Sequence, residues 1–174
     1  MHPLKLQTSR LELLLEDTSA VLARIEAMPP EDRAQISPLW LEQLASSLPS
    51  PWTHGFSIVE RESGIPVGSC MFKGAPDDAG GVEIAYGIHP QSRGSGYAKE
   101  AAGALVRFAY GAGAAVVYAH TLPRESESTS VLTHCGFKNV GEVVDPEDGP
   151  VWRWTHIAGP PNNSFNPMPL RGTG

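Results

Sequence analysis

The sequence is short of charge, of cysteine and of long apolar runs. Charged residues make up 18% of its 174 residues, and 19 acidic against 13 basic side chains leave a formal net charge of −6. A negative chain is repelled by the backbone of a nucleic acid, so no nucleic-acid partner is expected, whereas a cationic acceptor such as an amine is compatible with this charge. No apolar run nears the ~20 residues that a membrane span needs, so no membrane partner is expected either.

Cysteine occurs twice, at Cys70 and Cys135, which is too few for a disulfide framework. Both residues stand in apolar contexts, GSCMF and THCGF, and this favours two buried thiols in a reducing cytoplasm. The opening residues, MHPLKLQTSRLELLLED, contain a short apolar stretch followed at once by acids. That pattern differs from a signal peptide, so we expect a cytoplasmic protein. Histidine and cysteine are scattered along the chain, so no metal site is expected.

What the sequence does contain is regular apolar patterning. Periods of two and of 3.6 residues predict a mixed α/β chain that forms one domain over residues 1–157. The Pro-, Asn- and Gly-rich residues 158–174 are expected to form a C-terminal tail. Strands are expected near residues 6–17, 54–60, 65–74, 82–88, 114–122, 138–144 and 151–157. Helices are expected near residues 17–28, 37–48, 96–111 and 125–136, with a break at PPEDR between the first two.

A glycine cluster stands between an expected strand and an expected helix, in HPQSRGSGYAKEAAGALVRFAY (residues 89–110). The first N–H groups of a helix lack internal partners and carry partial positive charge, and Gly94 and Gly96 would let an anion approach the backbone. Arg93 could add a charged contact. A plain turn between strand and helix is the alternative. The cluster is neither a G-x-x-x-x-G-K-[ST] loop nor a dinucleotide G-x-G-x-x-G loop, in which Lys99 would have to be Gly or Ala.

The segment RGSGYA, residues 93–98, resembles the acetyl-CoA loop [Q/R]-x-x-G-x-[G/A] of the GNAT superfamily of N-acetyltransferases. The wider stretch VEIAYGIHPQSRGSGYAKEA resembles the fourth strand, loop and third helix of that family. ESTSVLTHCGF resembles its downstream helix, and LQTSRLELLLEDTSAVLARI resembles its opening segment. Together these segments are typical of the branch that contains the ribosomal-protein N-terminal (alanine and serine) acetyltransferases, and the resemblance covers about residues 6–157.

The resemblance implies a GNAT fold, which is an α/β (α+β) architecture. Its mixed central sheet has about seven strands, with strands 4 and 5 splayed apart, and about four helices flank it. Acetyl-CoA is the implied cosubstrate, without a metal. Backbone groups of Ile88 and His89 would bind its pantetheine in the gap between the splayed strands. Backbone N–H groups of the loop would bind its pyrophosphate, from Arg93, Gly94, Ser95, Gly96, Tyr97 and Ala98. Lys99 could add charge toward the phosphates or be a solvated helix lysine.

The resemblance also implies catalytic candidates. Glu83 matches the glutamate of the family's E-I-x-Y and would be the base or the amine binder; the alternative is a half-exposed strand glutamate that pairs with a neighbour. Ser128 keeps a family serine and could donate to the departing thiolate, or it could bond local backbone groups at a helix start. Two positions depart from the family pattern, because Leu132 stands where many members have a tyrosine general acid and Glu125 where many have asparagine.

Further polar and aromatic residues have weaker signals. His120 and His134 have no carboxylate at a fixed spacing, which favours structural or surface roles. Trp52 precedes the second expected strand, near the place where the family admits its acceptor. Trp152 and Trp154 share one strand face and would pack in a core or at the edge of a homodimer.

The function that follows from the resemblance is direct transfer of an acetyl group to a primary amine, either a protein N-terminus or a small molecule. No cysteine lies at the loop to act as a nucleophile. The alternative is a non-catalytic acyl-CoA-binding sensor, which the departures at Leu132 and Glu125 favour.

Overall fold

The computed structural model describes residues 4–146 and 148–157, so the expected tail at 158–174 lies outside the described residues. The strands are Lys5–Gln7 (β1), Leu11–Leu15 (β2), Phe56–Glu60 (β3), Pro66–Phe72 (β4), Gly81–Ile88 (β5), Val116–Thr121 (β6), Lys138–Asp145 (β7) and Gly149–Ile157 (β8). The helices are Thr18–Glu26 (α1), Pro30–Arg33 (α2), Pro38–Ser46 (α3), Tyr97–Gly111 (α4) and Glu127–His134 (α5), with a 3-10 turn at Pro90–Ser92 (η1).

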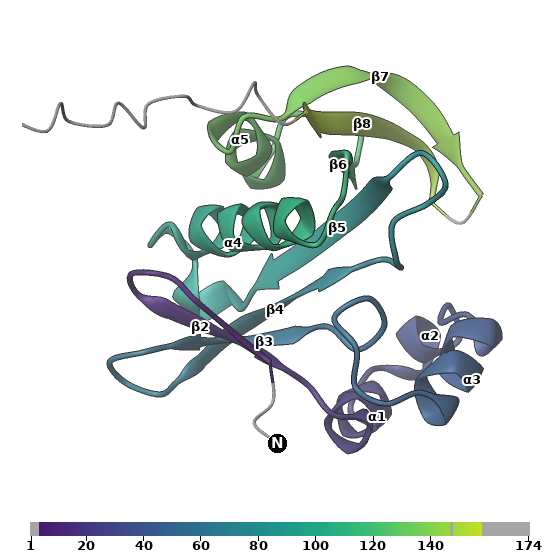
Figure 1. The fold of residues 1–174 in the computed structure, drawn as a ribbon, viewed down its shortest axis with the longest axis vertical. Coiled ribbons are helices and arrows are strands. Elements are labelled where there is room, and N and C mark those ends of the chain that lie inside the picture. The colour runs from purple at the N-terminus through teal and green to yellow at the C-terminus, as the bar shows by residue number, and fades with distance from the viewer. Residues whose placement is uncertain (1–3, 147, 158–174) are drawn as a thin grey trace, which may run out of the picture.

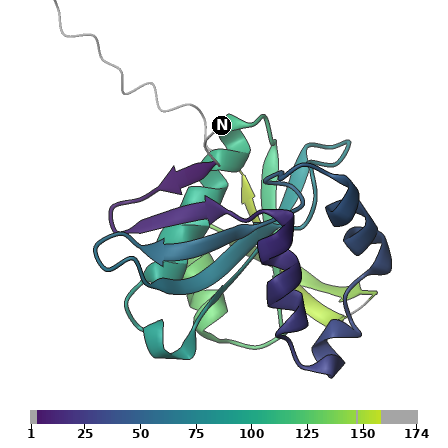
Figure 2. The ribbon, with the colours of Figure 1, turned by 90° about the horizontal axis from the view of Figure 1, so that it is seen from below.

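The strands form one mixed sheet in the order β1-β2-β3-β4-β5-β6-β8-β7. Within the described residues, β5 and β6 are parallel and the other neighbouring pairs are antiparallel. Helices α1, α2 and α3 lie together on one side of the sheet, and α4 lies across the sheet from them (Figure 1, Figure 2). The expected mixed α/β architecture is confirmed, with eight strands in place of about seven.

The additional strand arises because the segment expected as one strand at 6–17 is a hairpin of β1 and β2. Its turn is closed by the N–H of Thr8, which donates to the carbonyl of Leu11 at 2.9 Å. Glu100 of α4 binds the turn from outside: it accepts from the N–H of Arg10 at 2.7 Å, from Arg10 Nε at 2.9 Å and from the hydroxyl of Thr8. The turn therefore depends on a helix that follows much later in the chain, which local patterning does not reveal.

The PPEDR segment, expected as a break, contains the short helix α2. Pro30 stands in its first turn, where the missing N–H of proline costs no helical hydrogen bond. Glu31 and Asp32 follow in the same turn, where their charge complements the helix dipole. The proline thus ends one helix and begins the next.

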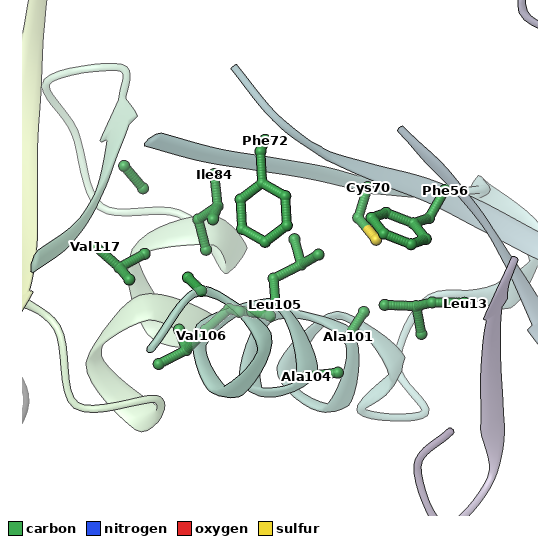
Figure 3. Close-up of a cluster of buried hydrophobic side chains, with 14 of the residues drawn as sticks. Leu13, Phe56, Cys70, Phe72, Ile84, Ala101, Ala104, Leu105, Val106 and Val117 are labelled. Atoms are coloured by element: carbon green, nitrogen blue, oxygen red, sulfur yellow. The ribbon is translucent and has the colours of Figure 1, made fainter. Parts of the chain in front are cut away.

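The core lies between α4 and the sheet. Ala101, Ala102, Leu105 and Ala109 recur at helical spacing and are fully buried. Figure 3 shows Phe72 and Ile84 pointing from the sheet toward Leu105 and Val106 of α4. The short alanine side chains let the helix lie close to the strands, and this packing fixes the beginning of α4 beside the end of β5.

β5 and β6 separate after a short paired stretch, which positions the site. They pair in parallel from Gly81 to Glu83 of β5. Beyond this point β5 continues against β4 as far as Ile88, and β6 continues against β8 as far as Thr121. Among the described residues, no strand pairs with the two edges that face each other. The splay expected between these two strands is therefore confirmed.

Candidate functional site

The loop before α4 presents N–H groups without partners. Gly94 and Gly96 have left-handed φ angles of 84° and 81°, which strain any residue that has a Cβ. Among the described residues, none accepts a hydrogen bond from the backbone N–H groups of residues 94–98. Gly96 is the N-cap of α4 and brings no side chain to its end, so the positive end of the helix dipole is open. The loop therefore has the features of an anion site.

A cleft of about 690 Å³ runs from this loop between the end of β5 and α5. We call it the loop cleft. Arg93 and Lys99 both line it and bring positive charge to the loop. Of the residues expected to bind cofactor or act in catalysis, the lining includes Ile88, Arg93, Gly94, Gly96, Tyr97, Ala98 and Ser128. Glu83, His89 and Ser95 are not among the described residues that line it.

Ile88 and His89 differ in what their backbones offer. The N–H of His89 donates to the carbonyl of Val67 at 2.8 Å, and its carbonyl accepts from Ser92 at 2.9 Å. Because hydrogen bonds alternate along an antiparallel strand, Ile88 points its N–H and carbonyl the other way, toward the gap beside β6. Arg93 Nε donates to that carbonyl at 3.1 Å, and the Ile88 N–H stays available. The structure thus brings Ile88 to the cleft, whereas the backbone of His89 is already used.

Tyr97 offers its backbone to the loop cleft, while its ring is held elsewhere. Its hydroxyl donates to Glu60 at the end of β3. The guanidinium of Arg10 lies 4.8 Å from the centre of its ring, a cation–π contact. These contacts hold the side chain against β2 and β3 and anchor the first turn of α4.

A second cleft, of about 1120 Å³, lies between the sheet and the helices α1 and α3. We call it the helical cleft. Its floor is the face of β4 and β5 that points away from α4, because its strand residues alternate with the core residues. Trp52, expected as a pocket residue, lines it. The floor consists of Ser69, Met71, Lys73, Ala85 and Gly87.

The two clefts meet at Tyr86 and Gly87, which line both. The Tyr86 hydroxyl donates to the carbonyl of Ser128 on α5 at 3.3 Å. Burial raises the pKa of the Tyr86 phenol, and the neighbouring Cys135 raises it further, so the phenol stays protonated at neutral pH. Sequence reasoning did not single out Tyr86. Its signal was the alternation of β5, which points it toward α5, and its place in the quoted E-I-x-Y segment.

Glu83 and His120 form a pair that the sequence did not reveal. His120 Nδ1 lies 2.6 Å from Glu83 Oε1, and Lys73 Nζ lies 3.9 Å from the same oxygen. The sequence shows no carboxylate at a fixed spacing from His120, because Glu83 reaches it only through the parallel pairing of β5 with β6. His120 Nε2 is buried, and no described residue bonds to it. Glu83 lies two residues before Ala85 on the same strand face, beside the helical cleft rather than in its lining.

The two positions that depart from the family pattern, Leu132 and Glu125, lie in α5 and just before it. Leu132 is 1% exposed and packs in the core, so no polar group stands at this position. Glu125 accepts from the hydroxyl of Thr129 at 3.0 Å, which ties it to the helix start. Ser126 is the N-cap of α5 in a capping box with Thr129. No described residue bonds to the Ser128 hydroxyl, which lines the cleft.

The two thiols are not activated, and Trp152, Trp154 and His134 line neither cleft. Burial raises the pKa of both Cys70 and Cys135, so neither is an activated thiolate. Cys70 is buried as expected, while Cys135 is only partly buried. Trp154 is 5% exposed in the core, and Trp152 packs beside it. His134 is exposed at the end of α5.

Residues 4–146 and 148–157 contain no cluster of three His, Cys, Asp or Glu side chains that could hold a metal ion. In the same residues, no helix is long and apolar enough to cross a membrane.

Comparison with known proteins identifies the family of the chain. Residues 11–138 match the family model described as an acetyltransferase (GNAT) domain. No curated protein matches the chain in sequence. Many solved structures match its fold.

Three of these structures illustrate the range of acceptors on the fold. The ribosomal-protein-S5-alanine acetyltransferase from Vibrio fischeri is 15% identical with a TM-score of 0.64, over 88% of this chain and 96% of its own. A ribosomal L7/L12 α-N-protein acetyltransferase in complex with coenzyme A is 16% identical with a TM-score of 0.66, over 88% and 98%. A spermidine N-acetyltransferase chimera from Vibrio cholerae is 14% identical with a TM-score of 0.66, over 86% and 96%. At such identities the likeness concerns the fold.

Proposed function

Because the chain belongs to the GNAT acetyltransferase family, we propose that it transfers an acetyl group from acetyl-CoA directly to a primary amine. The observation that carries the proposal is the junction of two different clefts at Tyr86 and Gly87. One cleft ends on the open N–H groups of a helix start, as a phosphate-bearing cosubstrate requires. The other opens from the opposite face of the sheet and would admit the acceptor.

The residues of the loop cleft fit acetyl-CoA, which supplies the acetyl group as an activated thioester. The N–H groups of residues 94–98 would bind its phosphates, supported by the charges of Arg93 and Lys99. The N–H of Ile88 faces the gap between β5 and β6, where it would bind the pantetheine or the thioester carbonyl. A related acetyltransferase has been solved with coenzyme A, which supports this assignment.

The transfer needs a proton to leave the amine and another to reach the sulfur, since a C–N bond forms as the C–S bond breaks. We assign the first task to Glu83, while His120 holds its carboxylate in place. Glu83 lies four residues before Gly87 on β5, roughly 13 Å at the rise of a β-strand, so the proton would reach it through a chain of water molecules. For the second task the hydroxyls of Tyr86 and Ser128 both line the loop cleft. Tyr86 would then replace the tyrosine whose usual position is filled by Leu132.

The acceptor, the compartment and the assembly belong to the same proposal. Solved relatives act on a ribosomal protein or on spermidine, which supports a peptide or small-molecule amine. The free thiols of Cys70 and Cys135 suit the reducing cytoplasm. The exposed Val140 and Val144 of the edge strand β7 would suit a homodimer contact.

The first experiment is calorimetric titration of the purified protein with acetyl-CoA, followed by thiol release against a panel of amines. Gly96→Val would strain the loop and obstruct its N–H groups, and should weaken acetyl-CoA binding at least tenfold. Gly111→Val places the same side chain in open space at the end of α4 and is the matched control. Unchanged binding by Gly96→Val would refute the loop assignment.

Glu83→Gln separates the enzyme from the alternative, a non-catalytic acyl-CoA sensor. In an enzyme this change should lower turnover about 100-fold, the contribution of a general base, and leave acetyl-CoA affinity unchanged. Binding of acetyl-CoA without thiol release for any amine would support the sensor.

A further inference from the structure

The residues that line the helical cleft indicate which kind of amine it accepts. The proposed function leaves the identity of that amine open. In a chain with a formal net charge of −6, none of the described residues that line this cleft is Asp or Glu. The charged residues in its lining are Arg24 and Lys73. Large apolar side chains form much of the rest, namely Val21, Ile25, Met28, Ile36, Trp40 and Met71.

This lining does not suit a polycation. An acceptor with several ammonium groups needs carboxylates to replace its lost hydration, and like charges at close range are repulsive. The nearest carboxylate on the floor strands is that of Glu83, whose Oε1 is already bound by His120 at 2.6 Å. Lys73 lines the cleft and Glu83 does not, so the charge that this pair presents to an acceptor is the ammonium.

Lys73 is the cation that an acceptor can use. Its ammonium lies 3.9 Å from Glu83 Oε1, at the outer limit of an ion pair, and its side chain is 46% exposed. Arg24, by contrast, lies 2.9 Å from Glu16 and is engaged. A carboxylate that enters the helical cleft would therefore be bound by Lys73 without displacing a short ion pair.

The strand register sets how far this carboxylate lies from the amine. Gly87, at the junction of the clefts, pairs with Ser69 of β4. Lys73 directly follows the last residue of β4 and lies four residues beyond Ser69, roughly 13 Å at the rise of a β-strand. The flexible stem of Lys73 covers part of that distance. The acceptor covers the rest, which corresponds to about two extended residues.

This inference rests on the proposed function. We infer that the helical cleft binds a peptide-like acceptor whose first residue is apolar and whose carboxylate lies about two extended residues from the amine. Lys73 binds that carboxylate. The amine would lie at Tyr86 and Gly87, the apolar side chain among the residues of α1 and α3, and the carboxylate at Lys73. A volume of about 1120 Å³ exceeds what a drug-sized ligand needs and has room for several residues.

The test measures kcat/KM by thiol release for four dipeptide amides and spermidine. Leu-Glu-amide should exceed Leu-Gln-amide roughly tenfold, the scale of one charge-assisted hydrogen bond, and should exceed Leu-Lys-amide by more. Gly-Glu-amide should fall below Leu-Glu-amide about tenfold because it buries no apolar side chain. Spermidine should be the poorest acceptor.

Variants assign the preference to Lys73. Lys73→Met should bring the ratio of Leu-Glu-amide to Leu-Gln-amide to about one, and Lys73→Glu should favour Leu-Lys-amide. Lys5→Met is the matched control: Lys5 is also a lysine in a loose ion pair, 3.4 Å from Glu12, but it lies outside the helical cleft. This control should keep the tenfold ratio.

Calorimetry of the same peptides with the protein and coenzyme A separates this inference from the proposed function. Preferential binding of Leu-Glu-amide, lost in Lys73→Met, would support the inference even if no thiol were released, and the absence of release would then count against the acetyl transfer. Thiol release that favours spermidine, or that is equal for the acidic, neutral and basic peptides, would overturn the inference and leave the transferase in place. Absence of peptide binding together with absence of release would overturn both.

Discussion

The loop cleft is built largely from backbone and the helical cleft from side chains. At the loop cleft, the N–H groups of residues 94–98 have no partner among the described residues, and the N–H of Ile88 faces the gap beside β6. In the helical cleft, side chains of α1, α3, β4 and β5 make the surface. A backbone site demands glycine at the positions with left-handed φ, so it leaves a motif in the sequence. A side-chain site draws single residues from distant elements, so it leaves none.

Gly68→Ala should break both clefts and has the largest expected effect. A Cβ at Gly68 would lie 2.1 Å from the carbonyl oxygen of Gly87. The backbone of residue 68 fixes this Cβ and the oxygen belongs to the backbone of β5, so neither can move without opening the β4–β5 ladder. We expect the free energy of unfolding to fall by about 3 kcal/mol. Acetyl-CoA binding should be lost with it, because the ladder carries Ile88. Urea unfolding and calorimetry measure the two effects.

Gly87→Ala is the control, since a Cβ there meets no atom within 4 Å. Its free energy of unfolding should stay within about 0.5 kcal/mol of the natural protein. Its methyl group lies at the junction of the clefts, so kcat/KM should fall although the fold is intact. A Gly68→Ala protein of natural stability would contradict the close approach of β4 to β5.

Tyr86→Phe sharpens the comparison, because it removes one hydroxyl from the point that both clefts share. If Tyr86 protonates the departing sulfur, turnover at saturating acetyl-CoA should fall roughly tenfold, less than the roughly 100-fold expected for a sole acid catalyst, since Ser128 remains as a second donor. Acetyl-CoA affinity should not change. Rapid mixing with detection of the free thiol measures the turnover, and calorimetry measures the affinity.

Ser128→Ala alone should lower turnover less than Tyr86→Phe does, and the double variant should lower turnover more than either single change. The Tyr86 hydroxyl donates to the Ser128 carbonyl at 3.3 Å, a long hydrogen bond whose loss should alter the unfolding free energy by less than about 1 kcal/mol. Natural turnover in the double variant would remove both hydroxyls from the mechanism.

The same contrast explains what the sequence could predict. Gly94 and Gly96 identified the loop because few residue types tolerate its backbone. The distinction between Ile88 and His89 needs the register with β4, which decides which N–H is used within the sheet. His120 binds a carboxylate that lies 37 residues earlier in the chain, so its role followed only from the pairing of β5 with β6.

Other features were unpredictable for a related reason. The turn between β1 and β2 is held by Glu100, a contact across 90 residues. The helical cleft has no local pattern, since neighbours in its lining come from separate helices and strands. Patterning thus predicted most elements that form from their own residues, with α2 as an exception, and missed the features that another element holds in place.

The smallest expected effect is a difference in how the two clefts respond to acid. His54 is 1% exposed and lines the helical cleft. Its Nδ1 accepts from the N–H of Ser50 at 3.2 Å, and its Nε2–H therefore donates to the hydroxyl of Thr18 at 2.9 Å. Burial lowers the pKa of His54 below the ordinary value of 6.5, against a weaker opposite effect of Asp17. A second proton on the ring would also displace the Ser50 hydrogen bond.

Because the folded pKa of His54 lies below the unfolded one, the unfolded chain takes up the proton first, and the free energy of unfolding falls as the pH drops below 6.5. On the loop side, burial raises the pKa of Glu100, but hydrogen bonds from Thr8 and Arg10 outweigh it and hold that pKa below 4.5. The turn held by Glu100 should therefore persist until the pH falls below 4.5. Acid should loosen the helical cleft first and the loop side later.

Urea unfolding of the natural protein and of His54→Gln between about pH 7.5 and 5.5 isolates this effect, which should be on the order of 1 kcal/mol or less. The natural protein should lose stability over this range, and His54→Gln should lose less. Burial also lowers the pKa of His156, but that residue is common to both proteins and cancels in the difference. Hydrogen exchange at about pH 5.5 should then show faster opening in α1 and α3 than in α4. Equal acceleration in all three helices would mean that the walls of the two clefts unfold as one unit.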